Sequence, residues 1–258
     1  GIAFDGVGYG DDDMLWGCEF MIADETSYQR RIHLDYVKLP GGEKAIRDPW
    51  RTAVAYLYDS LGEKAFDFIP GLRDNHSQEE ISIIGEMLKK NINCPQISSA
   101  GRLFDAASAL MGIRLECRFE GQAAITLEMI ADKNADGVYP IELKESGDKH
   151  IINPLPLLLA IIQDRKNGIG IPETAGKFHN TIAQIITQGA EIIRKETGIT
   201  RAALSGGVFQ NMLLMNKAVA LLESKGFNVF YHHRVPCNDG GISLGQAVIA
   251  SNMLKNKR

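Results

Sequence analysis

The feature that most constrains the fold of this chain is Ser205–Asn211 (SGGVFQN), because an apolar run precedes it and an amphipathic run follows it. Apolar residues 202–204, a glycine pair and helical spacing from Met212 predict a strand, a tight turn and a helix. Paired glycines let the backbone approach a ligand closely, and the next helix would direct free N–H groups toward it. A phosphate or nucleotide is the expected ligand. A tight turn without a ligand is the alternative, because short glycine motifs are weak evidence.

A second glycine-rich stretch lies near the N-terminus. Residues 1–23 predict a hairpin with its turn at 11–13 (DDD). The three glycines of residues 5–10 (DGVGYG) exceed what a turn needs, and a second phosphate-binding loop would explain them. Asp5 would then hold a metal-bound water or a ribose hydroxyl. The alternative is a twisted edge hairpin whose carboxylates are solvated.

The third candidate is a helix start at residues 98–105 (SSAGRLFD). Ser98 and Ser99 are good N-cap residues. Gly101 permits close approach of a ligand, and Asp105 lies one turn further along the same helix. The alternative is an ordinary capped helix with Asp105 as a surface charge.

The last candidate residue is Asp239, which precedes two glycines and a final helix expected to end near Leu254. A carboxylate at that position is either a helix cap or a metal ligand.

Between these stretches the spacing of apolar residues predicts a mixture of strands and helices. Strands are expected at 28–39, 137–143 and 227–232, and helices from about residue 45 and at 78–90, 122–131, 177–196 and 212–225. The expected fold class is α/β.

Composition excludes several function classes. The net charge of -4 argues against a nucleic-acid partner, and the longest apolar run, residues 154–163, is too short to cross a membrane. The four cysteines form no C-x-x-C pair, which favours a reduced, cytoplasmic protein. The chain begins with GIAF, an apolar strand without Met or a polar lead-in, so we expect a part upstream of it.

The order of these elements is similar to one lobe of the actin, sugar kinase and Hsp70 (ASKHA) superfamily: a mixed sheet flanked by helices, with helical insertions. The amino-acid sequence itself resembles those of the HypF carbamoyltransferases of [NiFe]-hydrogenase maturation. The similar segments are FDGVGYGDDDMLWGCEF (4–20), LPGGEKAIRDPWR (39–51), SSAGRLFDAASALMGI (98–113), FEGQAAITLE (119–128), FHNTIA (178–183), LSGGVFQN (204–211) and VPCNDGGISLGQA (235–247).

This resemblance implies a specific function. HypF enzymes convert carbamoyl phosphate and ATP into a carbamoyl adenylate, and pass the carbamoyl group to the C-terminal cysteine thiol of HypE, which makes the cyanide ligand of the hydrogenase iron. Residues 1–258 would be most of the C-terminal, TsaD-like transferase domain, chiefly its second lobe. The acylphosphatase, zinc-finger-like and adenylate-forming domains of the family have no counterpart in this chain.

The resemblance also implies roles for single residues. Gly206, Gly207 and Asn211 match an adenosine-side loop, Gly101 and Asp105 a helix that touches ribose or phosphate, and Asp5, Gly6 and Gly8 a phosphate-side hairpin. Asp239 matches an aspartate that holds a divalent metal (zinc, iron or magnesium) with two histidines. Those histidines belong to a motif upstream of the hairpin, so this chain would carry an incomplete metal site. His33, His76 and His179 are not expected to replace them.

Three residues depart from the family pattern. Asp13 and Cys18 stand where glycine is expected, and Cys237 stands where proline is expected. Cys237 is either a reactive thiol near Asp239 or a simple packing substitution.

Three other functions stay open. One is a small-molecule kinase or phosphotransferase of the same superfamily, the second an O-carbamoyltransferase, and the third a non-enzymatic lobe that only binds HypE. No serine or cysteine has an evident activating base, which favours direct transfer, and no catalytic residue is identified.

Overall fold

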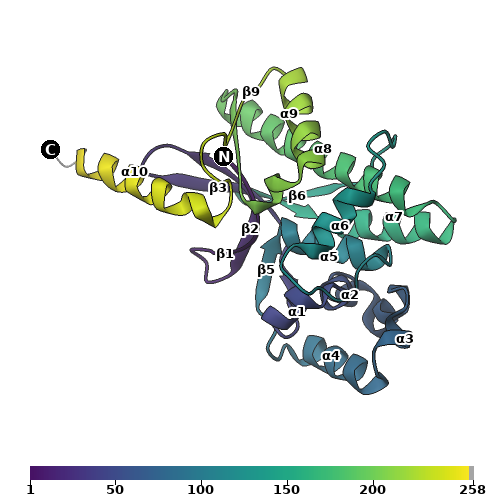
Figure 1. Cartoon of the computed structure of the whole chain (residues 1–258). Coiled ribbons are helices and arrows are strands. Elements are labelled where there is room, and N and C mark those ends of the chain that lie inside the picture. The colour runs from purple at the N-terminus through teal and green to yellow at the C-terminus, as the bar shows by residue number, and fades with distance from the viewer. Residues whose placement is uncertain (256–258) are drawn as a thin grey trace.

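The computed structural model describes residues 1–255, which form one mixed sheet flanked by helices (Figure 1). The main path of the sheet runs β6-β7-β3-β2-β1-β8-β9; off this path, β5 pairs with β2 and β4 pairs with β5. The strands are β1 (Ile2–Tyr9), β2 (Leu15–Ala23), β3 (Tyr28–Leu34), β4 (Val37–Lys38), β5 (Gln96–Ser99), β6 (Glu142–Ser146), β7 (Lys149–Asn153), β8 (Arg201–Ser205) and β9 (Asn228–Tyr231). The expected α/β class is confirmed.

Along one of its sides, strand β2 pairs with two different strands. Its second half, Glu19–Ala23, pairs antiparallel with β3, whereas Leu15–Gly17 pairs parallel with β5. On its other side β2 pairs antiparallel with β1, which in turn runs parallel to β8. This division of the sheet brings the end of β5 beside the middle of β1.

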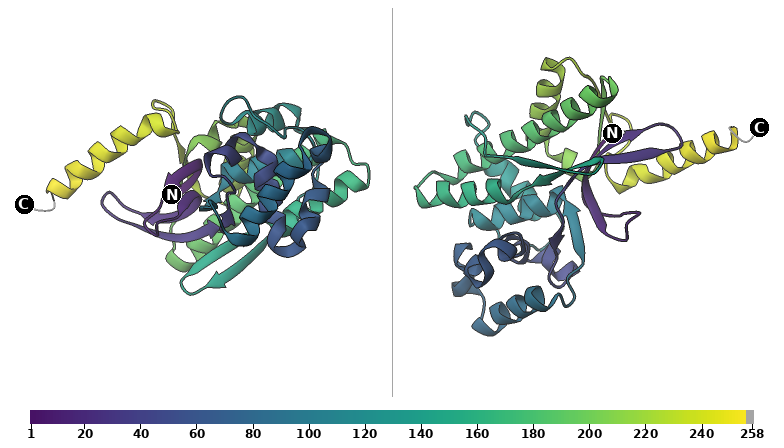
Figure 2. Two further views of the ribbon diagram at one scale, coloured as in Figure 1. Left: turned by 90° about the horizontal axis from the view of Figure 1, so that it is seen from below. Right: turned by 180° about the vertical axis from the view of Figure 1, so that it is seen from behind.

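Helices flank the sheet on both sides of the position where β2 changes partner from β5 to β3. The α-helices are α1 (Glu43–Arg47), α2 (Pro49–Leu61), α3 (Leu72–Asn75), α4 (Gln78–Lys90), α5 (Ala100–Leu110), α6 (Gln122–Ile130), α7 (Leu155–Lys166), α8 (Ile171–Thr197), α9 (Met212–Ser224) and α10 (Ile242–Lys255). Short 3₁₀ helices are η1 (Gly62–Phe68), η2 (Gly207–Gln210) and η3 (Asp239–Gly241). Figures 1 and 2 place α8 and α9 together, while α1 to α4 form a separate layer beside α5.

Aromatic side chains join the glycine turn to the centre of the sheet. The ring of Phe4 on β1 stacks on Phe209 of η2, with centroids 5.6 Å apart, and meets Phe20 of β2 edge to face at the same distance. All three side chains are buried. Aromatic pairs of this kind add stability beyond their buried area, so η2 is fixed directly over β1.

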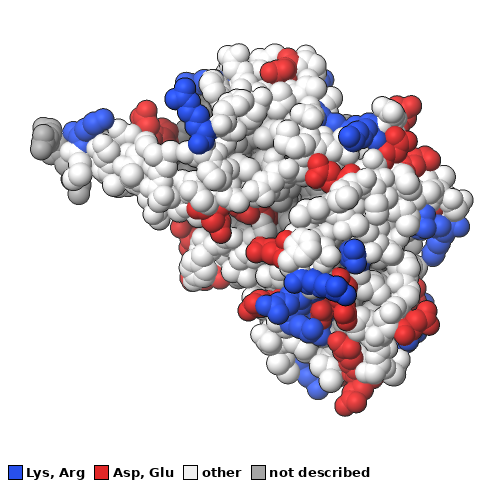
Figure 3. Space-filling view, viewed as in Figure 1, with Lys and Arg blue, Asp and Glu red and all other residues white. Residues whose placement is uncertain are grey.

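Helix α10 differs from the others because it projects from the body in every view (Figures 1 and 2). None of its residues is buried. Figure 3 shows that most of its surface on that face is uncharged.

Most of the elements expected from the sequence are present. The hairpin turn falls at residues 11–13, Ser77 caps α4 by accepting a hydrogen bond from Glu80 N, and Gly198 ends α8 in a left-handed conformation with φ of 74°. Helix α8 begins at Ile171, six residues before the expected start, because Pro172 lies in its first turn, where proline is tolerated.

The strand expected at 137–143 begins only at Glu142, and residues 137–141 form no strand. Strands β6 and β7 instead form a hairpin across a turn at Gly147, whose φ is 63°. The preceding segment is held by side chains: Tyr139 N donates to Thr181 Oγ1, and the Tyr139 hydroxyl donates to Asp164 Oδ2. The last strand also ends earlier than expected, at Tyr231 rather than His232. Within residues 1–255, no helix has the length and apolar character needed to cross a bilayer.

Candidate functional site

The predicted site residues converge on a pocket of about 550 Å³ between β1, α5, α6, η2 and η3. Seven of the nine line it: Asp5, Gly6, Gly101, Asp105, Gly207, Asn211 and Asp239. They come from four separate stretches of the sequence. The fold therefore gathers the glycine turn, the hairpin, the helix start and the C-terminal aspartate around one space.

The other two predicted residues, Gly8 and Gly206, lie outside the lining of the pocket. Gly8 pairs with Trp16 inside the β1–β2 hairpin, and β1 continues as a strand to Tyr9. The expected second phosphate-binding loop is therefore a strand with one irregularity in its pairing, between Phe4 and Gly8. Gly206 has φ of 103°, and a Cβ there would overlap the Phe4 carbonyl. It allows the turn to lie directly against β1.

Gly101 allows an equally close contact on the other side of β1. A Cβ on Gly101 would lie 2.9 Å from the Gly6 Cα. Ser99 caps α5 as predicted, accepting from Arg102 N, and its hydroxyl also reaches the carbonyls of Asp5 and Gly6, at 2.9 and 2.6 Å. The start of α5 is thus bonded to the segment that it faces.

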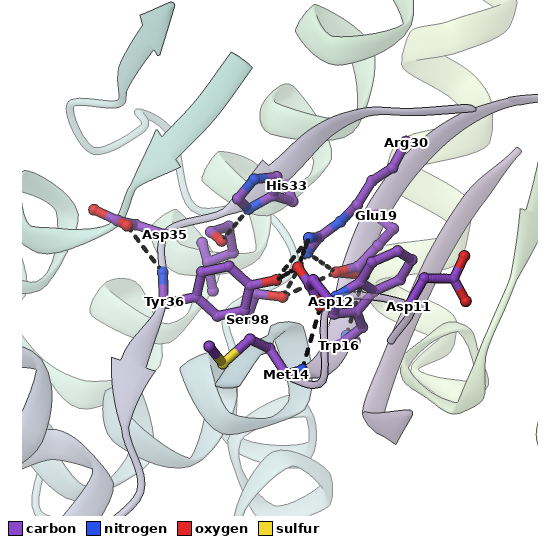
Figure 4. A network of polar contacts seen from close by, with 12 residues as sticks. Asp11, Asp12, Met14, Trp16, Glu19, Arg30, His33, Asp35, Tyr36 and Ser98 are labelled. Carbon is purple, nitrogen blue, oxygen red and sulfur yellow. Dashed lines mark hydrogen bonds and ion pairs between the residues drawn. The ribbon is translucent and has the colours of Figure 1, made fainter. Parts of the chain in front are cut away.

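The second candidate cap, Ser98, has a different role: it belongs to the buried network of Figure 4. The guanidinium of Arg30 donates to Glu19 Oε1 at 2.7 Å and to Ser98 Oγ at 2.9 Å, and its carbon lies 3.9 Å from the centre of the Trp16 ring. Burial raises the pKa of Glu19, and the attraction of Arg30 opposes that shift. This network joins β2, β3 and β5.

The tip of the hairpin is attached to the same network. Asp12 Oδ1 accepts from Trp16 Nε1 at 2.7 Å, and Asp12 Oδ2 accepts from the Tyr36 hydroxyl at 2.6 Å. Asp13 beside it has φ of 61°, a conformation that favours glycine, as expected for this position. The sequence showed only alternation in residues 28–39 and no sign of this network.

Asp105 is buried, so the surface-charge alternative is wrong. Its Oδ2 lies 3.0 Å from Arg102 Nε, and both side chains are only 3% exposed. Burial raises the pKa of Asp105 to about 6, against the opposing effect of the Arg102 charge. Arg102 also lines the pocket and was not recognised from the sequence.

Asn211 is the N-cap of α9 and is held by His179. Its Oδ1 accepts from Leu214 N, and its Nδ2 donates to His179 Nε2, both at 2.9 Å. His179 Nδ1 donates to the Ala175 carbonyl at 2.8 Å, and burial lowers the pKa of this histidine to about 4. His179 is therefore a neutral structural residue, with both ring nitrogens in use.

Asp239 begins η3, but its neighbour Asn238 provides the cap by accepting from Gly240 N at 3.2 Å. The Asp239 side chain is exposed at the rim of the pocket. Across residues 1–255, no three potential metal ligands of the His, Cys, Asp or Glu type come together. A carboxylate at this position is thus available to a ligand rather than used as a cap.

Two further side chains near the glycine turn bear on nucleophilic chemistry. The Cys237 carbonyl accepts from Gly206 N at 2.8 Å, and burial raises the pKa of its thiol, which argues against a reactive thiolate. Ser205 Oγ lies 3.1 Å from Nε2 of the exposed His232. Sequence reasoning missed this base because 26 residues separate it from Ser205, and the pair lies outside the pocket lining.

Comparison with solved structures identifies the class of protein. The chain superimposes on full-length HypF in its phosphate- and nucleotide-bound form with a TM-score of 0.90 and 41% identity, covering 98% of this chain and 39% of that one. For HypF of T. kodakarensis the TM-score is 0.86 at 28% identity, covering 99% of this chain and 34% of that one. The family model for the carbamoyltransferase, Kae1-like domain, second subdomain, matches residues 1–246. The fold is that of a Kae1-like carbamoyltransferase subdomain.

Curated relatives give the particular family. The probable carbamoyltransferase HypF of Methanocaldococcus jannaschii is 34% identical over 256 residues, which cover 99% of this chain and 32% of that protein. The carbamoyltransferase HypF of Synechocystis is 34% identical over 259 residues, covering 95% and 33%. This chain belongs to the HypF carbamoyltransferase family, and it spans about a third of the length of these relatives.

A more distant relative has a different named activity. The tRNA N6-adenosine threonylcarbamoyltransferase of Polynucleobacter asymbioticus is 27% identical over 204 residues, covering 72% of this chain and 55% of that protein.

Proposed function

We propose that this chain binds the nucleotide end of a carbamoyl adenylate, made from carbamoyl phosphate and ATP, within a protein that transfers the carbamoyl group. The observation that carries this proposal is the convergence of seven predicted residues on one pocket. The nucleotide-bound form of the similar HypF structure supports it.

The proposed binding roles follow the positions of the residues. Gly207 and Asn211 would shape the adenosine side, with Gly206 holding their turn against β1. Asp5 and Gly6 would face the phosphate, with Gly8 in the strand that carries them. Gly101 and Asp105 lie between these two groups.

The proposed acceptor is the C-terminal cysteine thiol of HypE. Its sulfur would attack the carbamoyl carbon, a C–S bond would form, and the bond from that carbon to the phosphate oxygen would break. AMP and the thiol proton are released. HypE would then convert the group into the cyanide ligand of the [NiFe]-hydrogenase iron.

Direct transfer, without a covalent enzyme intermediate, is supported by the cysteines of this chain. The pKa values of Cys18, Cys94 and Cys237 are raised by burial, and that of Cys117 is raised to about 11. These thiols are poor nucleophiles at neutral pH. Free cysteines are also typical of reducing compartments, which supports a cytoplasmic location.

We also propose that Asp239 is one ligand of a divalent metal such as zinc, iron or magnesium. Its exposed carboxylate fits this role, but residues 1–255 provide no complete ligand set. The other ligands would come from outside this chain, so no reaction step is assigned to the metal. Metal analysis of the whole protein checks this proposal: Asp239→Ala should lower the bound metal, and an unchanged content would contradict it.

The transfer itself is tested by incubating the whole protein that carries this chain with HypE, carbamoyl phosphate and ATP, then weighing HypE by intact mass spectrometry. We expect a gain of one carbamoyl group, abolished by Asp239→Ala. The control is Asp74→Ala, which removes an exposed carboxylate in α3. No gain on HypE would refute the proposal. Phosphate appearing on a small molecule would instead indicate a kinase, and a carbamoylated hydroxyl an O-carbamoyltransferase.

A further inference from the structure

Arg102 is the one basic residue among the described residues that line the pocket. Five carboxylates line the same space: Asp5, Asp105, Glu120, Glu128 and Asp239. Among these charged side chains, only Arg102 attracts a ligand that carries negative charge. The position of that side chain therefore decides where the ligand's anionic group can lie.

The guanidinium of Arg102 keeps unused donors although it is buried. Within the described part of the chain, its Nε and Nη1 have no hydrogen-bond partner, and neither has Asp105 Oδ2. Asp105 Oδ2 lies 3.0 Å from Nε and forms an ion pair with it, so Nη1 is the donor left without any partner among the described residues. Buried donors are normally paired, and arginine presents five of them in a rigid fork that fits phosphate.

This guanidinium lies beside Gly6 of β1, which also lines the pocket. A Cβ on Gly6 would lie 3.8 Å from Arg102 Nη2 and 3.5 Å from Glu120 Oε1. Both side chains thus reach the backbone of Gly6 from the pocket side. Arg102 also lies in the first turn of α5, an 11-residue helix whose N-terminus favours anions.

We infer that Arg102 binds the phosphate of the nucleotide, and that Asp105 is a positioning residue that holds the guanidinium rather than a ligand of the ribose. The inference rests on the proposed function, because it takes the nucleotide as the occupant of the pocket. It changes the role expected for Asp105 from the sequence and adds a residue that the sequence did not reveal.

The test compares AMP with adenosine, which differ only in the phosphate, by isothermal titration calorimetry of the whole protein. A hydrogen-bonded charge contributes enough that Arg102→Gln should weaken AMP binding about 10- to 100-fold. Adenosine binding should change less than about 2-fold. Arg114→Gln, which removes an exposed arginine outside the pocket lining, is the matched control and should change neither.

A second variant removes the risk of an unpaired buried charge. Arg102→Met combined with Asp105→Asn eliminates both charges together, which is far less destabilising than removing one partner. We expect it to keep adenosine binding and to lose AMP binding at least 10-fold. Unchanged AMP affinity, or an equal loss of AMP and adenosine, would overturn the role of Arg102. An equal loss of AMP and adenosine binding in Asp105→Asn would overturn the positioning role.

The same titrations separate this inference from the proposed function. If the unsubstituted protein binds neither AMP nor adenosine, the nucleotide pocket itself is refuted. If it binds AMP and Arg102→Gln binds AMP equally well, only the role of Arg102 fails.

Discussion

At the scale of single residues, His179 shows how a buried side chain supports the site without touching a ligand. Because burial depresses its pKa from 6.5 to about 4, the folded chain binds fewer protons than the unfolded chain between these values. We therefore expect the free energy of unfolding to fall by roughly 3 kcal/mol as the pH is lowered from 6.5 toward 4. Urea denaturation at several pH values measures this loss. His179→Asn should show a weaker pH dependence, and an identical dependence would contradict the assignment.

Gly206 gives a second prediction at this scale. Alanine there would need a strained φ of 103° and would overlap the Phe4 carbonyl. We expect Gly206→Ala to lower the free energy of unfolding by about 3 kcal/mol. Gly245→Ala in α10 is the control, because nothing lies within 4 Å of the added methyl. It should change stability by no more than about 1 kcal/mol, in the stabilising direction. Equal effects of the two substitutions would disagree with this account.

At the scale of elements, the network around Arg30 holds β2, β3 and β5 together. Removing one partner of a buried pair leaves an uncompensated charge, so Arg30→Met should cost about 3 to 5 kcal/mol in unfolding free energy. Arg31→Met is the matched control, because Arg31 pairs with Glu196 near the surface and should cost less than about 1 kcal/mol. Chemical denaturation compares the two. A loss below about 1 kcal/mol in Arg30→Met, as small as that expected for Arg31→Met, would show that the network contributes little.

Elements defined by local signals were predictable, and those defined by long-range pairing were not. The glycine turn at 205–211, the cap at Ser99 and the end of α8 at Gly198 each follow from a few neighbouring residues. The β6–β7 hairpin was missed because its strands alternate weakly. The burial of Asp105 depends on how close α5 comes to β1, and the Arg30 network on the division of β2 between two partners. Sequence periodicity specifies neither.

At the scale of the whole molecule, α10 is the least integrated element. Its exposed apolar side chains include Ile242, Leu244, Val248 and Leu254, and none of its residues is buried. Ending the chain at Gly241 should therefore change the free energy of unfolding by less than about 1 kcal/mol. Thermal denaturation of residues 1–241 and 1–258 makes the comparison. A large loss of stability would show that α10 packs against the body in solution.

The parallel pairing of β1 with β8 determines when the centre of the sheet can form during synthesis. Ile2 lies opposite Leu204, so β1 has to wait for a partner that is about 200 residues further along the chain. Roughly 200 residues added at about 5 to 20 per second correspond to a delay of roughly 10 to 40 s on the ribosome. During that time the β8 edge of β1 lacks its partner, and an unpaired edge invites aggregation. The centre of the sheet, and the pocket above it, are thus among the last parts of this chain to be completed.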